Sequence, residues 1–382
     1  MGLIRLIVLA ALAALLIAAP PVRAAAPAPL PEAQSQQLTS FLTAVNQEAH
    51  GYLPPLTFQS VVQGIFHAGQ SGWNPGTVLS GLTRYLVHTL LQSSVLLGKL
   101  VILGVACAML ENVSRAFGSE QVARIAYTVA YLALLALALE SFTGALGIGR
   151  GTVSDLVHLM EAMLPLLVTL IASVGAFTSA GLFNPLVVFA ITMVPLVVGS
   201  VVLPLVYLST LVEMVGTFTL YKLKPFAGLL RQSALVSLAL FMTVFLGFVA
   251  VFGAAGPVSD GVTLKTAKFV AATFIPVVGK LFADSAEIVF GSSFLLKQAV
   301  SVIGLIGLFL TLIFPVLKLV SIMMAYRVSA AVLGPVGGEP LVDSLSAMGN
   351  AVMYIAIAVG CVGLMLFLVF TITLAAGRGV LP

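Results

Sequence analysis

The sequence predicts an all-α fold: a polytopic helical membrane protein with about seven transmembrane helices after a cleaved signal peptide. Hydrophobic residues make up 60% of the 382 residues and charged residues only 8%, whereas a soluble globular protein has about 25% charged residues. The mean hydropathy is +1.17, so lipid must cover much of the apolar surface. The apolar runs are continuous and do not alternate with period two, which argues against a β-barrel.

The N-terminus has the pattern of a secretory signal peptide, which we assign to residues 1–26. Arg5 precedes an apolar stretch, Leu6–Ala19, which is shorter than the roughly 20 residues of a membrane span. Small residues near Ala24 offer cleavage sites. An uncleaved anchor is the alternative, but the prolines that follow Ala19 break a helix and favour cleavage.

Residues 27–84 form the expected extracytoplasmic amphipathic segment. Glu32–Ala49 and Phe58–His67 each place apolar side chains at helical spacing, and a loop is expected at Gly69–Gly76. Short amphipathic helices of this kind lie on a membrane surface or on a partner protein. The alternative is a small cap that packs on the spans.

Seven spans are expected in a membrane domain that covers residues 85–382. They lie near residues 85–110, 123–146, 160–182, 186–211, 233–255, 299–324 and 350–376. The uncharged stretch Ala180–Pro185 is expected to link the third and fourth spans as a tight turn or as part of a re-entrant hairpin. Prolines inside the spans predict kinks: Pro165, Pro195, Pro204 and Pro315.

The orientation of the spans does not follow from their flanking charges. With seven crossings, seven basic residues fall on one side of the membrane and six on the other. The positive-inside rule needs a clear excess on the cytoplasmic side. It therefore favours neither orientation.

A polar island, Asp260–Lys297, interrupts the apolar sequence within a segment near 256–298 that we expect to be interfacial or re-entrant. Lys280, Asp284 and Glu287 are spaced to share one helical face, and Lys265 and Lys268 are three residues apart. Such a polar stripe either contacts a partner protein or a pore, or is the solvated face of an interfacial helix.

Some charged residues lie well inside predicted spans. Lys99 is near the middle of the first span, and Glu140 is near the end of the second. A charge at the centre of a lone membrane helix costs roughly 2.5–3.5 kcal/mol, so the two are candidate partners on antiparallel helices. The alternative is that each reaches the interface by snorkelling. Lys318 lies in the last third of its predicted span, where snorkelling is expected.

The sequence offers no catalytic or cofactor-binding pattern, so no enzyme activity, cofactor or metal site is expected. The four histidines are scattered, and no pair has the spacing of zinc ligands. No phosphate-binding Gly-rich loop and no Gly-x-Ser-x-Gly motif occurs. The net charge of +4 is dispersed, unlike the clustered basic face of a nucleic-acid-binding protein. Cys107 and Cys361 both lie in apolar runs and are expected to be packing residues rather than a disulfide.

Several stretches, in order along residues 85–376, resemble the stage III sporulation protein AE family of endospore-forming bacteria. The most distinctive are Thr243-Val-Phe-Leu-Gly247, Asp260-Gly-Val262, Thr266-Ala-Lys268, Phe274-Ile-Pro-Val-Val-Gly279 and Ala330-Ala-Val-Leu-Gly-Pro-Val-Gly-Gly338. Others are Leu97-Gly-Lys-Leu-Val-Ile-Leu103, Ala126-Tyr-Thr-Val-Ala-Tyr131 and Val362-Gly-Leu-Met365. The segment 27–84 is only loosely similar.

This resemblance implies a non-enzymatic membrane subunit in the mother-cell membrane around the forespore. Its implied partners are membrane lipids, other stage III A sporulation proteins and a forespore channel protein. Together they would form a channel, or feeding tube, needed for endospore formation and late forespore sigma-factor activity. The competing hypothesis is a transporter or permease for small solutes, whose path would use Lys99, Glu140 and the polar island.

Overall fold

The computed structural model describes residues 39, 42–43, 46–47, 51–57, 75–116, 120–173, 177–217, 223–274, 278–335 and 338–375. Side chains are described in these ranges except at 75, 111–124, 126–127, 173–180, 182–183, 253–298 and 375. All regular secondary structure in the described residues is helical. The all-α class that the composition predicts is therefore confirmed, whereas the predicted signal peptide lies outside the described residues.

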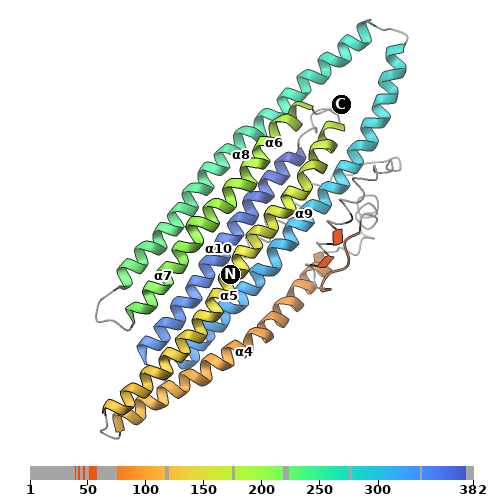
Figure 1. The fold of residues 1–382 in the computed structure, drawn as a ribbon. Coiled ribbons are helices and arrows are strands. Elements are labelled where there is room, and N and C mark those ends of the chain that lie inside the picture. The colour runs from red at the N-terminus through yellow and green to blue at the C-terminus, as the bar shows by residue number, and fades with distance from the viewer. Residues whose placement is uncertain are drawn as a thin grey trace.

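The helices run side by side as an elongated bundle (Figure 1). In chain order they are α4 (Pro75–Ala116), α5 (Glu120–Ser173), α6 (Phe177–Val197), the π-helix η1 (Val198–Val202), α7 (Leu203–Gly216), α8 (Lys224–Phe274), α9 (Val278–Leu333) and α10 (Glu339–Ala375). Helix α9 packs against α10, α4 and α5, and α10 also contacts α6, α7 and α8. The last two helices of the chain therefore form the centre of the bundle.

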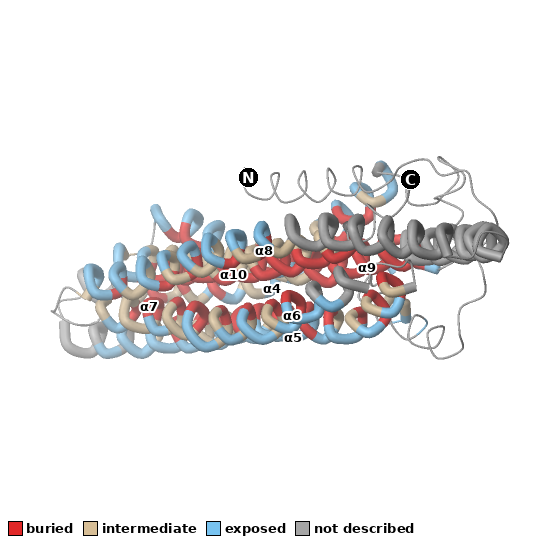
Figure 2. Tube along the Cα trace, turned by 90° about the horizontal axis from the view of Figure 1, so that it is seen from above, coloured by how far each residue is buried: buried red, intermediate tan, exposed pale blue. Residues whose placement is uncertain are grey.

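The buried and exposed faces of the helices show which surfaces meet lipid. In the most apolar window of the α9 span 83% of residues are buried, against 17% for α8 and 22% for α4. Buried residues lie on the helix faces that point into the bundle, and exposed residues lie on the faces that point outward (Figure 2). Large apolar side chains are exposed along the outer helices, among them Leu91, Leu229 and Leu240. An apolar surface of this extent needs lipid or a partner protein to cover it.

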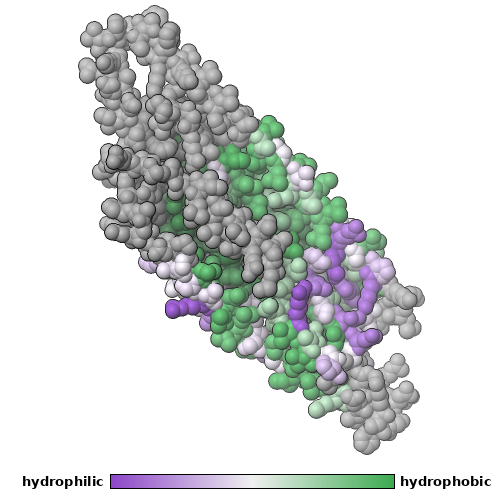
Figure 3. All heavy atoms as spheres, turned by 180° about the vertical axis from the view of Figure 1, so that it is seen from behind, coloured by the Kyte–Doolittle hydropathy of each residue, from purple (hydrophilic) through white to green (hydrophobic). Residues whose placement is uncertain are grey.

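Polar side chains gather toward one end of this apolar surface. Figure 3 shows a broad hydrophobic area, with hydrophilic residues concentrated near the end where α7 leads into α8. Lys224 and Asp343 are exposed at this end. On this face the described surface is thus apolar, with a polar end near α7 and α8.

Six helical segments in the described residues are long and apolar enough to cross a membrane, where the sequence predicted seven. They are Gly76–Leu110, Thr128–Ala172, Asn184–Gly216, Lys224–Phe252, Ala299–Leu333 and Glu339–Leu374. The predicted second span and most of the predicted third fall on one continuous helix, α5. Its 54 residues extend about 80 Å at 1.5 Å per residue.

The sequence predicted two spans here because polar residues, among them Arg150 and Asp155, interrupt the apolar sequence between residues 146 and 160. Polar side chains lower the hydropathy without breaking the backbone hydrogen bonds of a helix, and α5 continues through them. The predicted linker Ala180–Pro185 is also wrong, because these residues lie inside α6, which begins at Phe177. Both errors come from reading hydropathy as if it marked helix ends.

The prolines lie within or beside helices, as the sequence predicts. Pro165 and Pro315 are inside α5 and α9, and Pro195 is inside α6. Pro204 occupies the first turn of α7, directly after the π-helix Val198–Val202. Proline has no N–H to donate to the carbonyl one turn earlier. A π-turn holds one more residue than an α-turn, and this extra residue accommodates the missing hydrogen bond. The helical stretch from α6 to α7 therefore continues past three prolines, Pro185, Pro195 and Pro204.

The polar island is divided between two helices. Its backbone is helical up to Phe274 at the end of α8 and again from Val278 at the start of α9. The side chains of Lys265, Lys268, Lys280, Asp284 and Glu287 lie outside the described residues. The helical backbone keeps Lys280, Asp284 and Glu287 at the spacing of one helical face.

A short N-terminal segment packs against α4. Leu53 and Leu56 are buried, and the Asn46 side chain both donates to the Leu56 carbonyl (2.9 Å) and accepts from its N–H (2.6 Å). A Cβ at Gly81 of α4 would collide with the Tyr52 carbonyl and the Leu53 side chain. Glycine at this position therefore allows the segment to approach the helix closely.

Glycine also sets the spacing of the central helices. A Cβ at Gly304 of α9 would overlap the Phe370 ring of α10 and the end of the Met163 side chain of α5. We expect Gly304→Ala to lower stability by roughly 1–3 kcal/mol, because the ring has no room to retreat in a packed core. Thermal unfolding of the detergent-purified protein measures this as a lower Tm. Gly147→Ala is the matched control, because its Cβ would meet open space; an equal loss in both variants would contradict close packing at Gly304.

Candidate functional site

The predicted pair of embedded charges, Lys99 and Glu140, lies on two neighbouring antiparallel helices, α4 and α5. Both residues are exposed. Among the described side chains no ion pair joins them. The structure therefore places both charges on the outside of the bundle, where lipid headgroups, water or a partner protein can meet them.

An ion pair that the sequence analysis missed joins α7 and α8. The Arg231 guanidinium donates to the Glu213 carboxylate, and the two side chains are only 19% and 21% exposed. The guanidinium carbon also lies 5.4 Å from the centre of the Tyr354 ring of α10, within the range of a cation–π interaction. One arginine thus links three helices.

A tyrosine hydroxyl joins further helices at the same end. The Tyr131 Oη of α5 lies 2.8 Å from Ser344 Oγ and 3.1 Å from the Pro340 carbonyl oxygen, both in α10. It also lies 3.1 Å from Thr217 Oγ1, directly after α7. We call the six residues of these two clusters the polar junction: Tyr131, Glu213, Thr217, Arg231, Ser344 and Tyr354.

The rim of the polar junction carries a more exposed pair. Lys224 Nζ of α8 donates to Asp343 Oδ2 of α10 at 2.6 Å, and both side chains are about half exposed or more. Solvent-exposed ion pairs contribute little because water and salt screen them. The partly buried Arg231–Glu213 pair is therefore the stronger of the two links between helices.

The sequence analysis missed the polar junction because the predicted spans on either side of it were too short. With spans at 186–211 and 233–255, both Glu213 and Arg231 fell in a loop. In the structure α7 continues to Gly216 and α8 begins at Lys224. The available signal was Glu213 as a single acidic residue at the end of a long apolar run, but its partner depends on how two helices pack.

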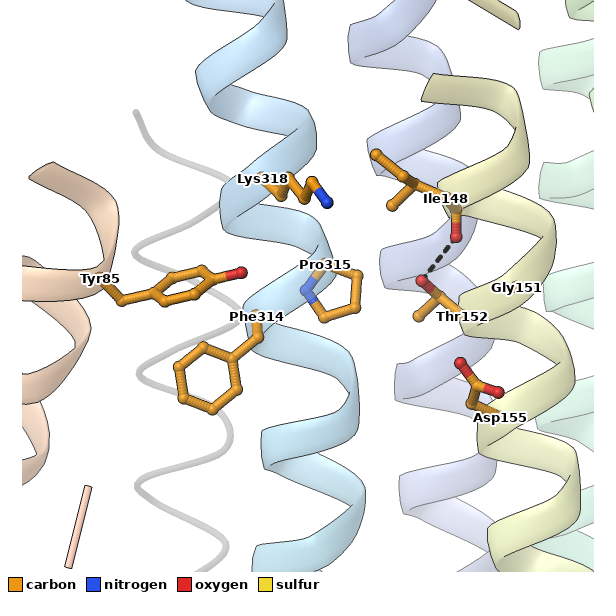
Figure 4. Close-up of a pocket in the computed structure, with 8 residues that line it drawn as sticks. All are labelled: Tyr85, Ile148, Gly151, Thr152, Asp155, Phe314, Pro315 and Lys318. Carbon is orange, nitrogen blue, oxygen red and sulfur yellow. Dashed lines mark hydrogen bonds between the residues drawn. The ribbon is translucent and has the colours of Figure 1, made fainter. Parts of the chain in front are cut away.

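A second polar feature is a pocket of about 200 Å³ formed by residues of α4, α5 and α9. Figure 4 shows the residues that line it: Tyr85, Ile148, Gly151, Thr152, Asp155, Phe314, Pro315 and Lys318. Near it, Ser321 Oγ donates to Thr89 Oγ1 at 3.2 Å and so ties α9 to α4. One acidic and one basic side chain line the pocket, and both Asp155 and Lys318 are exposed.

Lys318 lies at a different place along its candidate span from the one that the sequence predicted. The predicted span ended at 324, which put Lys318 in its last third. The observed span continues to Leu333, so Lys318 is near the middle of Ala299–Leu333. The Lys318 side chain is exposed, and its snorkelling to the interface stays a prediction.

The described residues contain no group of three or more His, Cys, Asp or Glu side chains that could hold a metal ion. Cys107 and Cys361 are free thiols, one buried and one partly buried, in agreement with their expected packing role.

Comparison with known proteins identifies the family. A family model described as stage III sporulation protein AE matches residues 56–377. The chain belongs to the stage III sporulation protein AE family. A protein named stage III sporulation protein AE from Bacillus subtilis (strain 168) is 36% identical over 346 residues, which cover 90% of this chain and 86% of that relative. No solved structure matches the chain.

The family assignment confirms the resemblance seen in the sequence motifs and supports a role in sporulation. Together with six helices that could cross a membrane, it describes a multi-pass membrane protein of spore formation. The stage III sporulation protein AE family is not known as a family of enzymes. The match covers both the polar junction and the pocket.

Arg231→Ala is expected to destabilise the protein by about 2 kcal/mol, because it leaves the Glu213 carboxylate partly buried without a counter-ion. Thermal unfolding in detergent micelles measures the loss as a lower Tm. Lys224→Ala is the matched control: it breaks the exposed pair with Asp343 and should cost less than about 1 kcal/mol. Equal effects of the two changes would show that Arg231 does not link the helices as described.

Tyr131→Phe is expected to cost about 1–2 kcal/mol, because it removes the hydroxyl shared by α5, α10 and Thr217. The comparison is Tyr207→Phe, since the Tyr207 ring stacks on Phe142 at 6.0 Å and its hydroxyl has no described hydrogen bond. Tm values of the two variants provide the measurement. A smaller loss for Tyr131→Phe than for Tyr207→Phe would contradict the role of the hydroxyl.

Proposed function

We propose that this protein is a non-enzymatic membrane subunit of the channel complex, or feeding tube, that connects the mother cell to the forespore. The observation that carries the proposal is the stage III sporulation protein AE match over residues 56–377. In this role the protein would sit in the mother-cell membrane around the forespore. It would be required for endospore formation and for late sigma-factor activity in the forespore.

The exposed charges of the bundle support a role within an assembly. Lys99 and Glu140 are exposed on α4 and α5 and form no ion pair with each other. Charges within membrane-spanning segments are costly unless they meet a partner or water. We assign them, with the polar-island residues Lys265, Lys268, Lys280, Asp284 and Glu287, to contacts with other stage III A sporulation proteins or with a forespore channel protein.

The architecture also supports a scaffold that holds a fixed shape. In the described residues the two central spans, α9 and α10, pack against the four other candidate spans. The polar junction ties α5, α7, α8 and α10 together at one end. A subunit of a channel must keep its contact surfaces in register while lipid surrounds it. Interhelical polar contacts of this kind specify the arrangement of helices in a membrane.

Deletion of the gene in the native host is expected to abolish heat-resistant spores and to silence a reporter of the late forespore sigma factor. Wild-type protein supplied in trans should restore both. Normal spore counts after deletion would refute the proposal. If spores are absent but the reporter is normal, the sporulation role stands and the link to sigma-factor activity is rejected.

The contact residues can be tested separately from stability. Lys99→Leu and Glu140→Leu should reduce the recovery of other stage III A proteins with the tagged subunit from crosslinked sporulating cells, while the Tm of the purified variants stays unchanged. Lys224→Ala, an exposed change at the polar junction, is the control. Full recovery with both leucine variants would remove these two residues from the interface.

A membrane transporter or permease for small solutes is the second candidate, and the charged pocket within the bundle favours it. The purified protein in liposomes distinguishes the two. Flux of small metabolites without partners, lost in Lys99→Leu, would support a transporter. Absence of flux would support a subunit that acts only in the complex.

A further inference from the structure

Two opposite charges face the same pocket from adjacent helices. Lys318 extends from α9 toward α5, and the Asp155 carboxylate extends from α5 toward α9 (Figure 4). Neither side chain forms an ion pair with another described residue. An aspartate and a lysine that share a pocket without pairing leave one anionic and one cationic position for an occupant.

The two charged residues lie far from the ends of their candidate spans. Lys318 lies near the middle of the span Ala299–Leu333, and Asp155 lies a few residues past the middle of Thr128–Ala172. Both side chains are exposed, so an occupant can reach them from outside the bundle. A ligand with both charges would compensate both side chains at once.

The walls of the pocket limit the size of its occupant. Tyr85 and Phe314 meet edge to face, with ring centres 4.6 Å apart, and form an apolar side. Gly151 has open space where a Cβ would lie. A volume of about 200 Å³ holds a small solute and is below the range of about 300–1,000 Å³ for drug-sized ligands.

We propose that this pocket binds a small zwitterionic solute, with its carboxylate at Lys318 and its ammonium group at Asp155. The Thr152 hydroxyl, which donates to the Ile148 carbonyl at 2.8 Å, keeps its oxygen as an acceptor for the ammonium group. The depth disfavours a zwitterionic lipid headgroup, because headgroups lie at the membrane interface. This site goes beyond the role of a structural subunit and does not depend on it.

The test uses the full-length protein in nanodiscs of phosphatidylglycerol, which contain no zwitterionic headgroup. Binding of L-alanine is measured by calorimetry beside propionate, which has only the negative charge, and ethylamine, which has only the positive one. We expect saturable alanine binding that is at least roughly tenfold tighter than that of either single-charge probe, because each charge-assisted hydrogen bond contributes separately. No saturable alanine binding, or equal binding of propionate, would overturn the proposal.

Asp155→Asn and Lys318→Met should each weaken alanine binding about tenfold or more. Glu161→Gln is the matched control on α5, since Glu161 is exposed and pairs with His158 rather than with the pocket. Gly151→Leu is an independent test, because it fills the pocket from an exposed helical position and should abolish binding without disturbing the core. Unchanged binding in Gly151→Leu would place the alanine elsewhere and reject the site.

Phosphatidylethanolamine separates a solute from a headgroup. Adding it to the nanodiscs should leave alanine binding unchanged if the pocket takes a solute. Competition by this lipid would identify a headgroup as the ligand and overturn the proposal. Binding is measured without partner proteins, so a failure to bind alanine does not contradict the sporulation role. Normal sporulation after gene deletion would likewise not contradict alanine binding.

Discussion

The structure depends on one constraint: polar groups inside a lipid-covered bundle must find their partners within the protein. Helices satisfy the backbone, because each N–H bonds within its own segment. Buried hydroxyls follow the same rule. Ser329 donates to the Ala325 carbonyl and Thr89 to the Tyr85 carbonyl, each one turn back. Tyr326 crosses to α5 and donates to the Ala138 carbonyl at 2.7 Å. At these positions each buried hydroxyl therefore has a hydrogen-bond partner within the protein.

Charged groups meet the same constraint in two ways. At the polar junction, Arg231 and Glu213 neutralise each other and the guanidinium lies against Tyr354, so the helix ends are tied together. In the pocket, Asp155 and Lys318 face a shared space instead of each other. Paired charges suit a structural contact such as the polar junction. Unpaired opposite charges suit a binding site such as the one we propose for the pocket. The two sites lie on different sets of helices and can serve different tasks.

Close packing at glycine explains why α9 and α10 occupy the centre. A Cβ at Gly304 would overlap Phe370, and one at Gly363 would overlap Leu312. Both contacts join α9 to α10. Without a hydrophobic driving force between helices in lipid, association relies on such close approach and on interhelical hydrogen bonds. The outer helices α4 and α8 are far less buried and present their apolar side chains outward.

The sequence alone determined the helical membrane class, because 60% hydrophobic residues in continuous runs can be accommodated only by lipid-facing helices. It also determined the family, through ordered motifs that the comparison confirmed. Hydropathy could not mark helix ends, so α5 was divided in two and the helical residues 180–185 were taken for a linker. Only the tertiary structure decided that Glu213 of α7 pairs with Arg231 of α8. It also decided that Asp155 and Lys318, 163 residues apart in the chain, line one pocket. Spacing along one helix predicts neighbours on that helix, whereas contacts between helices depend on their rotation and depth, which the side chains of the whole bundle set together.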